Sequence, residues 1–276
     1  MVSMASGFYR LGGGIYYGAY PAEHVSGRWN MAATSAKMRR TDVPFADGDW
    51  AACLQDNHAP TQQELEELPR ALNTLLRCLG VPEGEGAADF TQTERRLGVS
   101  LPEELKILCR ALSRTELPPL NGEGFLPLAQ MYIDGDYLVF YKIRRRPAGL
   151  SLKDGTLAWY DKKAWQYSPG DENFVNYVLD RLAVLAIGQM PAIRKGRIRG
   201  PLCSTLHPEE ELAKIFGEKL RVLEEYRNYG NILLVHEDGA IGFFRQNGFY
   251  ADILLGCRSR EILDGLPASG LDAVWS

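Results

Sequence analysis

The sequence predicts an α+β protein, because segments with helical periodicity are followed, twice over, by segments rich in strand-forming residues. Leucines recur at helical spacing ahead of the strand-rich parts. Asp-Gly and Asn-Gly pairs, the strongest short signals for β-hairpins, separate the later apolar runs. Runs of helices and runs of strands, without strict alternation, favour a mixed or antiparallel sheet covered by helices over a parallel α/β sheet.

The composition is that of an ordinary globular protein. The 276 residues are 45% hydrophobic and 24% charged, and their formal net charge is −4. No part of the chain has the basic excess that direct nucleic-acid binding needs, and no apolar run approaches the roughly 20 residues that cross a bilayer. The five cysteines include no Cys-x-x-Cys pair, and the first residues lack a secretory leader pattern. We therefore expect a cytoplasmic protein that binds neither membranes nor nucleic acids directly.

Composition and turn signals divide the chain into three regions. Residues 1–60 are rich in Gly and Tyr and are expected to form an N-terminal arm with short strands. Residues 61–190 contain helices and then strands. Residues 191–276 contain a helix and a three-stranded meander, which forms either a separate domain or a part of the preceding one.

Three helices are predicted in the first part of the middle region. Thr61 and Glu64 form a capping box, in which the hydroxyl and the carboxylate each bind a backbone amide at the helix start. Leucines follow at helical spacing up to Gly80, which ends this first helix. Residues 91–94 and 100–103 repeat the capping pattern and predict two shorter helices.

Strands and a fourth helix follow. Residues 137–143 are rich in β-forming residues, and Asp154-Gly155 predicts a hairpin turn before the next strand at 156–160. The helix is expected from Phe174, with apolar residues at intervals of three and four.

The C-terminal region is expected to begin with a connector at residues 191–201. Pro208 fits the first position of a helix, whose apolar stripe runs to Leu223. The meander follows, with its turns at Asp238-Gly239 and Asn247-Gly248.

A short motif between the second and third predicted helices is the most specific feature of the chain. It consists of Glu94, Leu97, Gly98, Leu101 and Pro102. Gly98 is able to adopt the left-handed conformation that ends a helix, and proline fits the first turn of the next one. Physically, the motif describes how two helices join.

Residues 90–185 resemble the SUKH superfamily, whose yeast founder is SMI1/KNR4. The Leu-Gly…Leu-Pro motif carries the resemblance, and Asn121-Gly122 is similar to the family's Asn-Gly turn. The resemblance implies an α+β fold and a non-enzymatic binding role without a cofactor. Many bacterial members are similar to immunity proteins that neutralise polymorphic toxins, often nucleases, whereas yeast members are similar to regulatory hubs of cell-wall synthesis.

An aromatic cluster is the best candidate for a protein-binding surface. Trp159 and its neighbour Tyr160 must face opposite sides of a strand. One of them is expected in the core and the other at the surface, with Trp165 and Tyr167 on the following loop. Trp159, Trp165 and Tyr167 are the residues expected to supply the buried contact with a partner. Exposed Trp and Tyr side chains are typical anchors of interfaces. The acidic residues nearby are expected to face a basic partner: Asp134, Asp136, Asp154 and Asp161.

The expected partner is a protein, most simply a cognate nuclease-like toxin whose active site the chain occludes. A regulatory scaffold with several partners is one alternative. The other is an enzyme that holds a divalent metal between Asp134 and Asp136, because the Asp-x-Asp pattern occurs in metal-dependent glycosyltransferases. A lone Asp-Gly-Asp before a strand is more typical of a turn, because Asp and Gly both favour turns. No histidine or cysteine spacing indicates a metal site.

Overall fold

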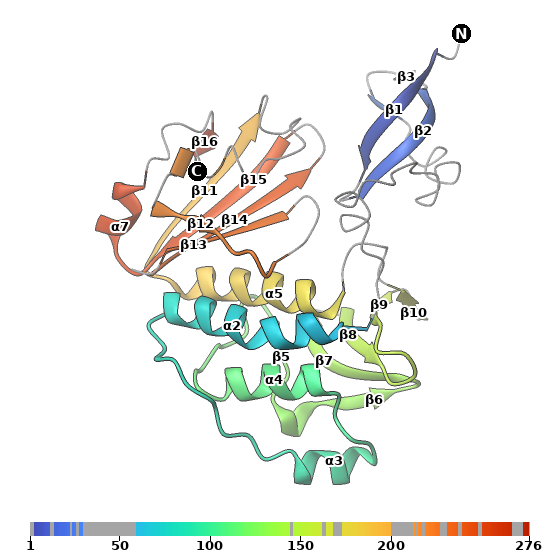
Figure 1. Ribbon diagram of the computed structural model, residues 1–276, viewed down its shortest axis with the longest axis vertical. Helices are drawn as coiled ribbons and strands as arrows, with labels where there is room; N and C mark the ends of the chain where they lie inside the picture. The colour runs from blue at the N-terminus through green and yellow to red at the C-terminus, as the bar shows by residue number, and fades with distance from the viewer. Residues whose placement is uncertain are drawn as a thin grey trace.

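The computed structural model shows an α+β protein with two six-stranded antiparallel sheets separated by helices (Figure 1). It describes residues 59–143, 146–161, 164–167, 173–199, 212, 215–216, 219–226, 231–236, 239–247, 250–266 and 273–275, together with the backbone of the strands between residues 3 and 29. No described helix is long and apolar enough to cross a membrane.

The N-terminal region contains two short antiparallel pairs, as the Gly- and Tyr-rich composition predicts. The first joins β1 (Ser3–Leu11) to β2 (Gly14–Ala22), and the second joins β3 (His24–Val25) to β4 (Arg28–Trp29).

Three helices follow, at the predicted positions. They are α2 (Gln62–Cys78), α3 (Thr91–Leu97) and α4 (Glu103–Leu112). The capping box at the start of α2 is confirmed, since Thr61 Oγ1 accepts from Glu64 N and Glu64 Oε2 accepts from Thr61 N. The boxes predicted for α3 and α4 are wrong, because neither helix has a side-chain cap from its N-cap residue.

The first sheet has the strand order β10-β9-β8-β7-β5, and β6 also pairs with β7. Its strands are β5 (Glu123–Phe125), β6 (Tyr132–Asp134), β7 (Tyr137–Ile143), β8 (Arg146–Ser151), β9 (Leu157–Asp161) and β10 (Ala164–Tyr167), with the short 3-10 turn η2 (Leu128–Gln130) before β6. A bulge between Val139 and Tyr141 interrupts the register of β7 and β8. Phe140 and Tyr141 consequently both contact Tyr177, with ring centroids 6.0 and 5.5 Å away.

Helix α5 (Phe174–Gln189) lies between the two sheets (Figure 1). Its sequence is apolar around most of its circumference, and twelve of its residues are buried. A helix of this kind needs cover on more than one side. On one side, Phe140 of the first sheet contacts Tyr177 of α5. On the other side, β14 and β15 of the second sheet contact α5, and α2 lies alongside it.

The second sheet has the order β12-β13-β14-β15-β11-β16. Its strands are β11 (Ala192–Arg199), β12 (Arg221–Val222), β13 (Asn231–His236), β14 (Ala240–Asn247), β15 (Tyr250–Cys257) and β16 (Ala273–Trp275), and α7 (Arg260–Gly265) packs beside β15 and β11. The predicted meander is therefore present as β13–β15, within a larger sheet. Its core residues Leu233 and Ile241 belong to the same hydrophobic cluster as Leu72 and Leu179, so one core continues across residue 190.

Two predictions for the C-terminal region are wrong. The expected connector at 191–201 is mostly strand β11, an interior strand. Two of its arginines pair with acidic residues, Arg194 with Asp264 at 3.1 Å and Arg197 with Asp252 at 2.9 Å. The expected helix does not reach Leu223, because β12 begins at Arg221. Leu223 packs in the main hydrophobic cluster, whereas Phe216 packs in a second cluster. The residues predicted to form one apolar helix face therefore belong to two separate clusters. Residues 201–211, including Pro208, lie outside the described part.

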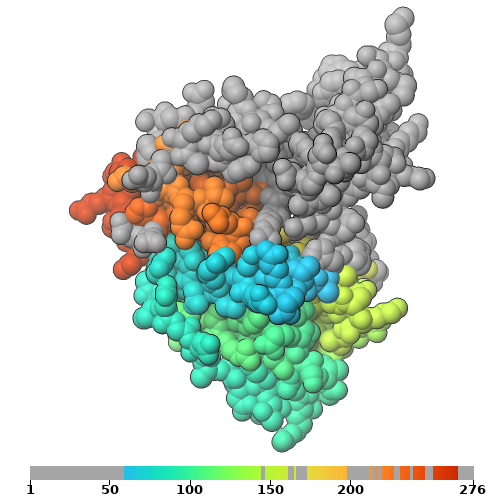
Figure 2. All heavy atoms as spheres, in the orientation of Figure 1, coloured from blue at the N-terminus to red at the C-terminus, as the bar shows by residue number. Residues whose placement is uncertain are grey.

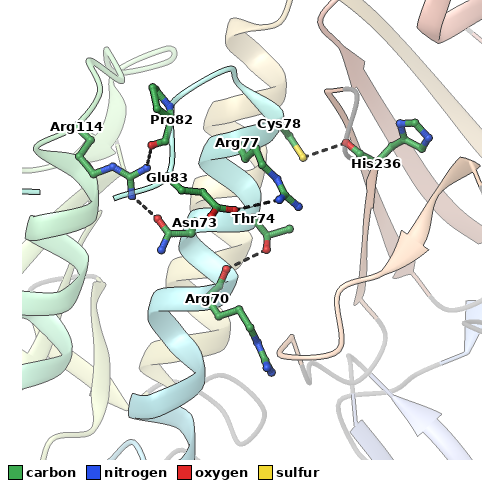
Figure 3. Close-up of polar contacts among 9 residues, drawn as sticks. All are labelled: Arg70, Asn73, Thr74, Arg77, Cys78, Pro82, Glu83, Arg114 and His236. Atoms are coloured by element: carbon green, nitrogen blue, oxygen red, sulfur yellow. Dashed lines mark hydrogen bonds and ion pairs between the residues drawn. The ribbon is translucent and has the colours of Figure 1, made fainter. Parts of the chain in front are cut away.

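Helix α2 lies on the visible face between the second sheet and α4 (Figure 2). Its polar contacts join it to the elements on both sides (Figure 3). Burial raises the pKa of the Cys78 thiol to about 11, so the thiol stays protonated, and it donates to the His236 carbonyl of β13 at 3.4 Å. On the other side, the guanidinium of Arg114, just after α4, donates to Asn73 Oδ1 and to the Pro82 carbonyl. The helix thus has a specific hydrogen-bonded contact with each half of the fold.

A second polar contact joins the starts of α2 and α5. Asn173 caps α5 by accepting from Asn176 N at 3.0 Å, and its side-chain amide donates to Glu64 Oε1 at 2.6 Å. Glu64 is also the third-position residue of the α2 capping box. The two caps therefore fix where both helices begin relative to each other.

Asp180 generates a prediction about stability and pH. Its carboxylate is buried on α5, accepts from the Tyr226 hydroxyl at 3.1 Å and lies 3.8 Å from Arg181. Burial raises the pKa of this carboxyl. The protonated form therefore stabilises the fold fully below the ordinary Asp pKa, and this contribution is lost as the pH rises through the raised value.

We expect Asp180→Asn to match the wild type in free energy of unfolding near pH 4 and to exceed it by the order of 1 kcal/mol near pH 7. Urea unfolding at both pH values measures the difference. Asp136→Asn, a change at an exposed turn, is the matched control and should give no such pH-dependent gain. A wild type as stable as Asp180→Asn at neutral pH contradicts the prediction.

Candidate functional site

The outer face of the first sheet gathers four aromatic side chains, which we call the aromatic face: Tyr132, Tyr137, Tyr160 and Trp165. Asp134 pairs with Tyr137 across β6 and β7, and Trp165 pairs with Tyr160 across β9 and β10. Directly paired residues share a face of a sheet, as do residues two apart in one strand, which places Tyr132 with Asp134. Four strands therefore contribute to one surface.

Trp165 is the centre of the aromatic face. Its ring stacks on Tyr137 at a centroid distance of 4.6 Å and an interplanar angle of 21°, and it meets Tyr160 edge-on at 5.6 Å. Its indole Nε1 donates to Asp134 Oδ2 at 3.1 Å. These contacts hold the indole flat along the sheet, since stacking and a hydrogen bond together specify its position and its rotation.

The indole lies flat because the strand beneath it carries a glycine. A Cβ added at Gly149 of β8 would lie 2.8 Å from the Trp165 ring and 3.1 Å from the Tyr137 Cβ. Gly149 pairs with Ala158 of β9, so two adjacent strands have small residues at this level. The absence of larger side chains makes room for a ring that starts on β10 and reaches β7.

Tyr132 is the most solvent-exposed member of the aromatic face. Its side chain is 45% exposed. Partial burial, and then the negative charge of Asp134, raise the pKa of its hydroxyl. The hydroxyl therefore remains protonated at neutral pH and is able to donate a hydrogen bond to a partner.

Trp159 lies on the opposite face of the sheet. Its ring meets Tyr177 of α5 at 4.8 Å in an edge-on arrangement, and the guanidinium of Arg181 lies 5.8 Å from the ring. The structure thus assigns Trp159 to the core side and Tyr160 to the outer side, as their adjacency in a strand requires. Trp159 is not brought together with Trp165, although the sequence groups them.

The position predicted for Trp165 and Tyr167 is wrong in one respect, since both belong to strand β10 and not to a loop. Tyr167 pairs with Ala158, and its side chain lies outside the described part, as does that of Asp161. Sequence reasoning omitted Tyr132 and Tyr137 from the candidate site. The sequence does contain a signal for them, because both tyrosines flank the Asp134-Gly-Asp136 turn. A hairpin at that turn places them in two paired strands.

The predicted acidic residues have different roles. Asp134 is exposed and holds the Trp165 indole, and Asp136 is exposed at the turn between β6 and β7. Asp154 accepts from the Thr156 hydroxyl at 2.7 Å, and this hydrogen bond is the largest cause that lowers the pKa of its carboxyl. Asp154 therefore shapes the hairpin turn after Ser151.

No cluster of three or more metal-ligating side chains occurs among the described residues. One oxygen of the Asp134 carboxylate that the metal hypothesis uses, Oδ2, accepts a hydrogen bond from the Trp165 indole. Asp136 follows Gly135, which adopts a φ of 59°, so the Asp-Gly-Asp segment is a tight turn between two paired strands.

The Leu-Gly…Leu-Pro motif joins α3 and α4 as predicted. Gly98 has a φ of 74° and ends α3, Leu101 is buried, and Pro102 stands just before the first residue of α4. Glu94 accepts from Leu101 N at 2.8 Å and from Lys106 Nζ at 2.9 Å. The acidic residue therefore stabilises the junction itself and does not cap its own helix.

The second part of the motif is a tight turn. Asn121 and Gly122 adopt φ values of 54° and 79°, and they connect Leu120 and Glu123, which exchange two backbone hydrogen bonds. Both residues of such a turn need positive φ, which explains the Asn-Gly pair.

Comparisons of the chain with models of protein families, with curated proteins and with solved structures give no match. The SUKH resemblance of residues 90–185 therefore remains a prediction.

The packing of Trp165 over Gly149 generates a structural prediction. Gly149→Ala should displace the indole from Tyr137 and lower the free energy of unfolding by about 1–3 kcal/mol, the usual cost of overpacking. Near-UV circular dichroism reports the indole environment, and urea unfolding reports the stability.

Gly265→Ala is the matched control, because a Cβ at Gly265 meets nothing within 4 Å. It should leave the near-UV spectrum unchanged and should not lower the free energy of unfolding, because Ala is favoured over Gly in a helix. If Gly149→Ala leaves the near-UV spectrum of the wild type intact, the described position of Trp165 is incorrect.

Proposed function

We propose that the chain is a protein-binding module that contacts its partner through the aromatic face. The observation that carries the proposal is the position of Trp165, held flat on the outer face of a sheet by Tyr137 and Asp134 and accompanied by the exposed Tyr132. Trp and Tyr are the residue types most enriched among binding hot spots.

The geometry of the aromatic face favours binding of a preformed kind. Its rings are attached to paired strands and contact one another, so little side-chain entropy is lost on association. Their polar atoms lie at the edges of apolar rings, which suits a surface that is partly desolvated by a partner.

Within this proposal, the most specific function is that of a SUKH-type immunity protein that occludes a toxin. The exposed carboxylates of Asp134 and Asp136 stand beside the aromatic face and would complement a basic, nuclease-like partner. The chain would act by steric occlusion and charge, without a cofactor. A regulatory scaffold would use the same surface for several weaker partners.

A pull-down from lysate of the native host, washed at low and at high salt, identifies the partner. A single stoichiometric partner whose toxic activity the chain blocks supports the immunity function, and several substoichiometric partners support the scaffold. A thermal shift on addition of Mn²⁺ that Asp134→Ala abolishes would instead favour the metal-dependent enzyme.

Tyr132→Ala tests the aromatic face without disturbing the core. We expect it to weaken affinity for the isolated partner by about 2 kcal/mol, roughly 30-fold, the threshold of a hot spot. Trp165→Ala should weaken it at least as much. Titration calorimetry with the purified partner measures both.

Ile193→Ala, at an exposed apolar position on the second sheet, is the matched control and should retain wild-type affinity. The surface assignment fails if Tyr132→Ala and Trp165→Ala bind as tightly as the wild type while remaining folded.

A further inference from the structure

A cavity on the other side of the first sheet is independent of the aromatic face. It has a volume of about 490 Å³ and lies between α4, the segment before α3 and the residues that precede β6. We call it the α4 pocket; its walls include Leu108, Cys109 and Leu112 of α4, together with Phe125, Met131 and Phe140. Pockets for small ligands have volumes of this order and are mostly apolar.

The walls of the α4 pocket are fixed by the core. Leu108, Met131 and Phe140 are at most 2% exposed, and Phe140 also contacts Phe174 of α5. Burial raises the pKa of the Cys109 thiol to about 12, as expected beside an apolar space. The deep walls are therefore rigid, and the accessible part of the lining includes the half-buried Leu112, Phe125 and Leu128.

The connection between α2 and α3 passes down beside α4 (Figure 1). Its residues form part of the rim of the pocket. The connection approaches α4 so closely that a Cβ added at Gly86 would overlap the Arg110 carbonyl. Ala87, Ala88 and Asp89 then line the pocket. Asp89 is the single charged side chain among the described lining residues.

Asp89 is ionised at neutral pH. Its Oδ1 accepts from Thr91 N at 2.9 Å, and this hydrogen bond is the largest cause that lowers the pKa of the carboxyl. The hydroxyl-bearing residues of the lining, Ser113 and Thr115, are neutral. One cation contacts the lining from outside it: Arg96 donates to the carbonyls of Leu128 and Met131 at 3.0 and 2.8 Å, so its guanidinium is held at those residues. An anionic head group beside Asp89 would face the negative charge of the Asp89 carboxylate.

We propose that the α4 pocket binds a small amphiphile, with its apolar body against Leu112, Phe125 and Leu128 and a cationic head beside Asp89. Burial of the body supplies most of the affinity, and Asp89 selects the sign of the head. A fatty-acid anion whose chain is as long as that of the cationic amphiphile should bind more weakly.

The test uses the full chain and a neutral naphthylamine dye that fluoresces in apolar sites. Decyltrimethylammonium and decanoate, both below their micelle concentrations, compete for the dye. We expect dye binding, and displacement by the cation at roughly tenfold lower concentration than by the anion, since attraction and repulsion at an exposed carboxylate each contribute up to about fivefold.

Two variants and a control locate the effect. Ala88→Phe should fill the rim and remove dye binding. Asp89→Asn, which keeps a residue suited to cap α3, should bind dye normally and reduce the preference for the cation to less than about twofold. Glu116→Gln, an exposed charge change next to the lining residues Thr115 and Leu117, should behave as the wild type.

Thermal unfolding shows whether each variant is folded. If Ala88→Phe does not fold, Asp89→Asn alone tests the proposal. The proposal is overturned if the wild type binds no dye, if folded Ala88→Phe binds it equally, or if the wild type does not distinguish the two heads. Trp165→Ala should change none of these results, which separates the pocket from the proposed protein-binding surface.

Discussion

The fold depends on the burial of α5 between two sheets. Phe174 and Tyr177 contact the first sheet, and Ile187 packs so closely on β15 that a Cβ at Gly256 would lie 2.9 Å from its side chain. Each apolar side chain of this size contributes roughly 1.5–3 kcal/mol when fully buried. A helix with this distribution is unstable beside a single sheet, so the second sheet completes the same core.

A central helix of this kind requires that its polar groups be satisfied internally. Asn173 both caps α5 and binds Glu64 of the α2 capping box. Asp180, in the interior of α5, is reached by the Tyr226 hydroxyl from the second half of the fold. These contacts fix the relative position of the helices more than they add to the free energy of unfolding. The net stabilisation from a buried polar pair is modest, but leaving one partner without the other is costly. They set the helices in one arrangement.

The inner packing of the first sheet leaves its two sides with different properties. Its inner side faces α5 and contributes Phe140 to the wall of the α4 pocket. Its outer side carries aromatic rings over small residues, with Trp165 above Gly149. The proposed protein-binding surface and the proposed pocket for an amphiphile thus share one sheet and are separated by its thickness.

The sequence by itself determined the features that depend on neighbours along the chain. The capping box of Thr61, the left-handed stop at Gly98 and the turns at Asn121-Gly122 and Asp154-Gly155 follow from local backbone chemistry, and each is present. The opposite sides of Trp159 and Tyr160 follow from the alternation of a strand. Only the tertiary structure decided which side meets α5, that residues 192–199 are an interior strand, and that Tyr132 and Tyr137 join Trp165. Those outcomes depend on strand register and on packing between distant segments, which periodicity in one segment does not encode.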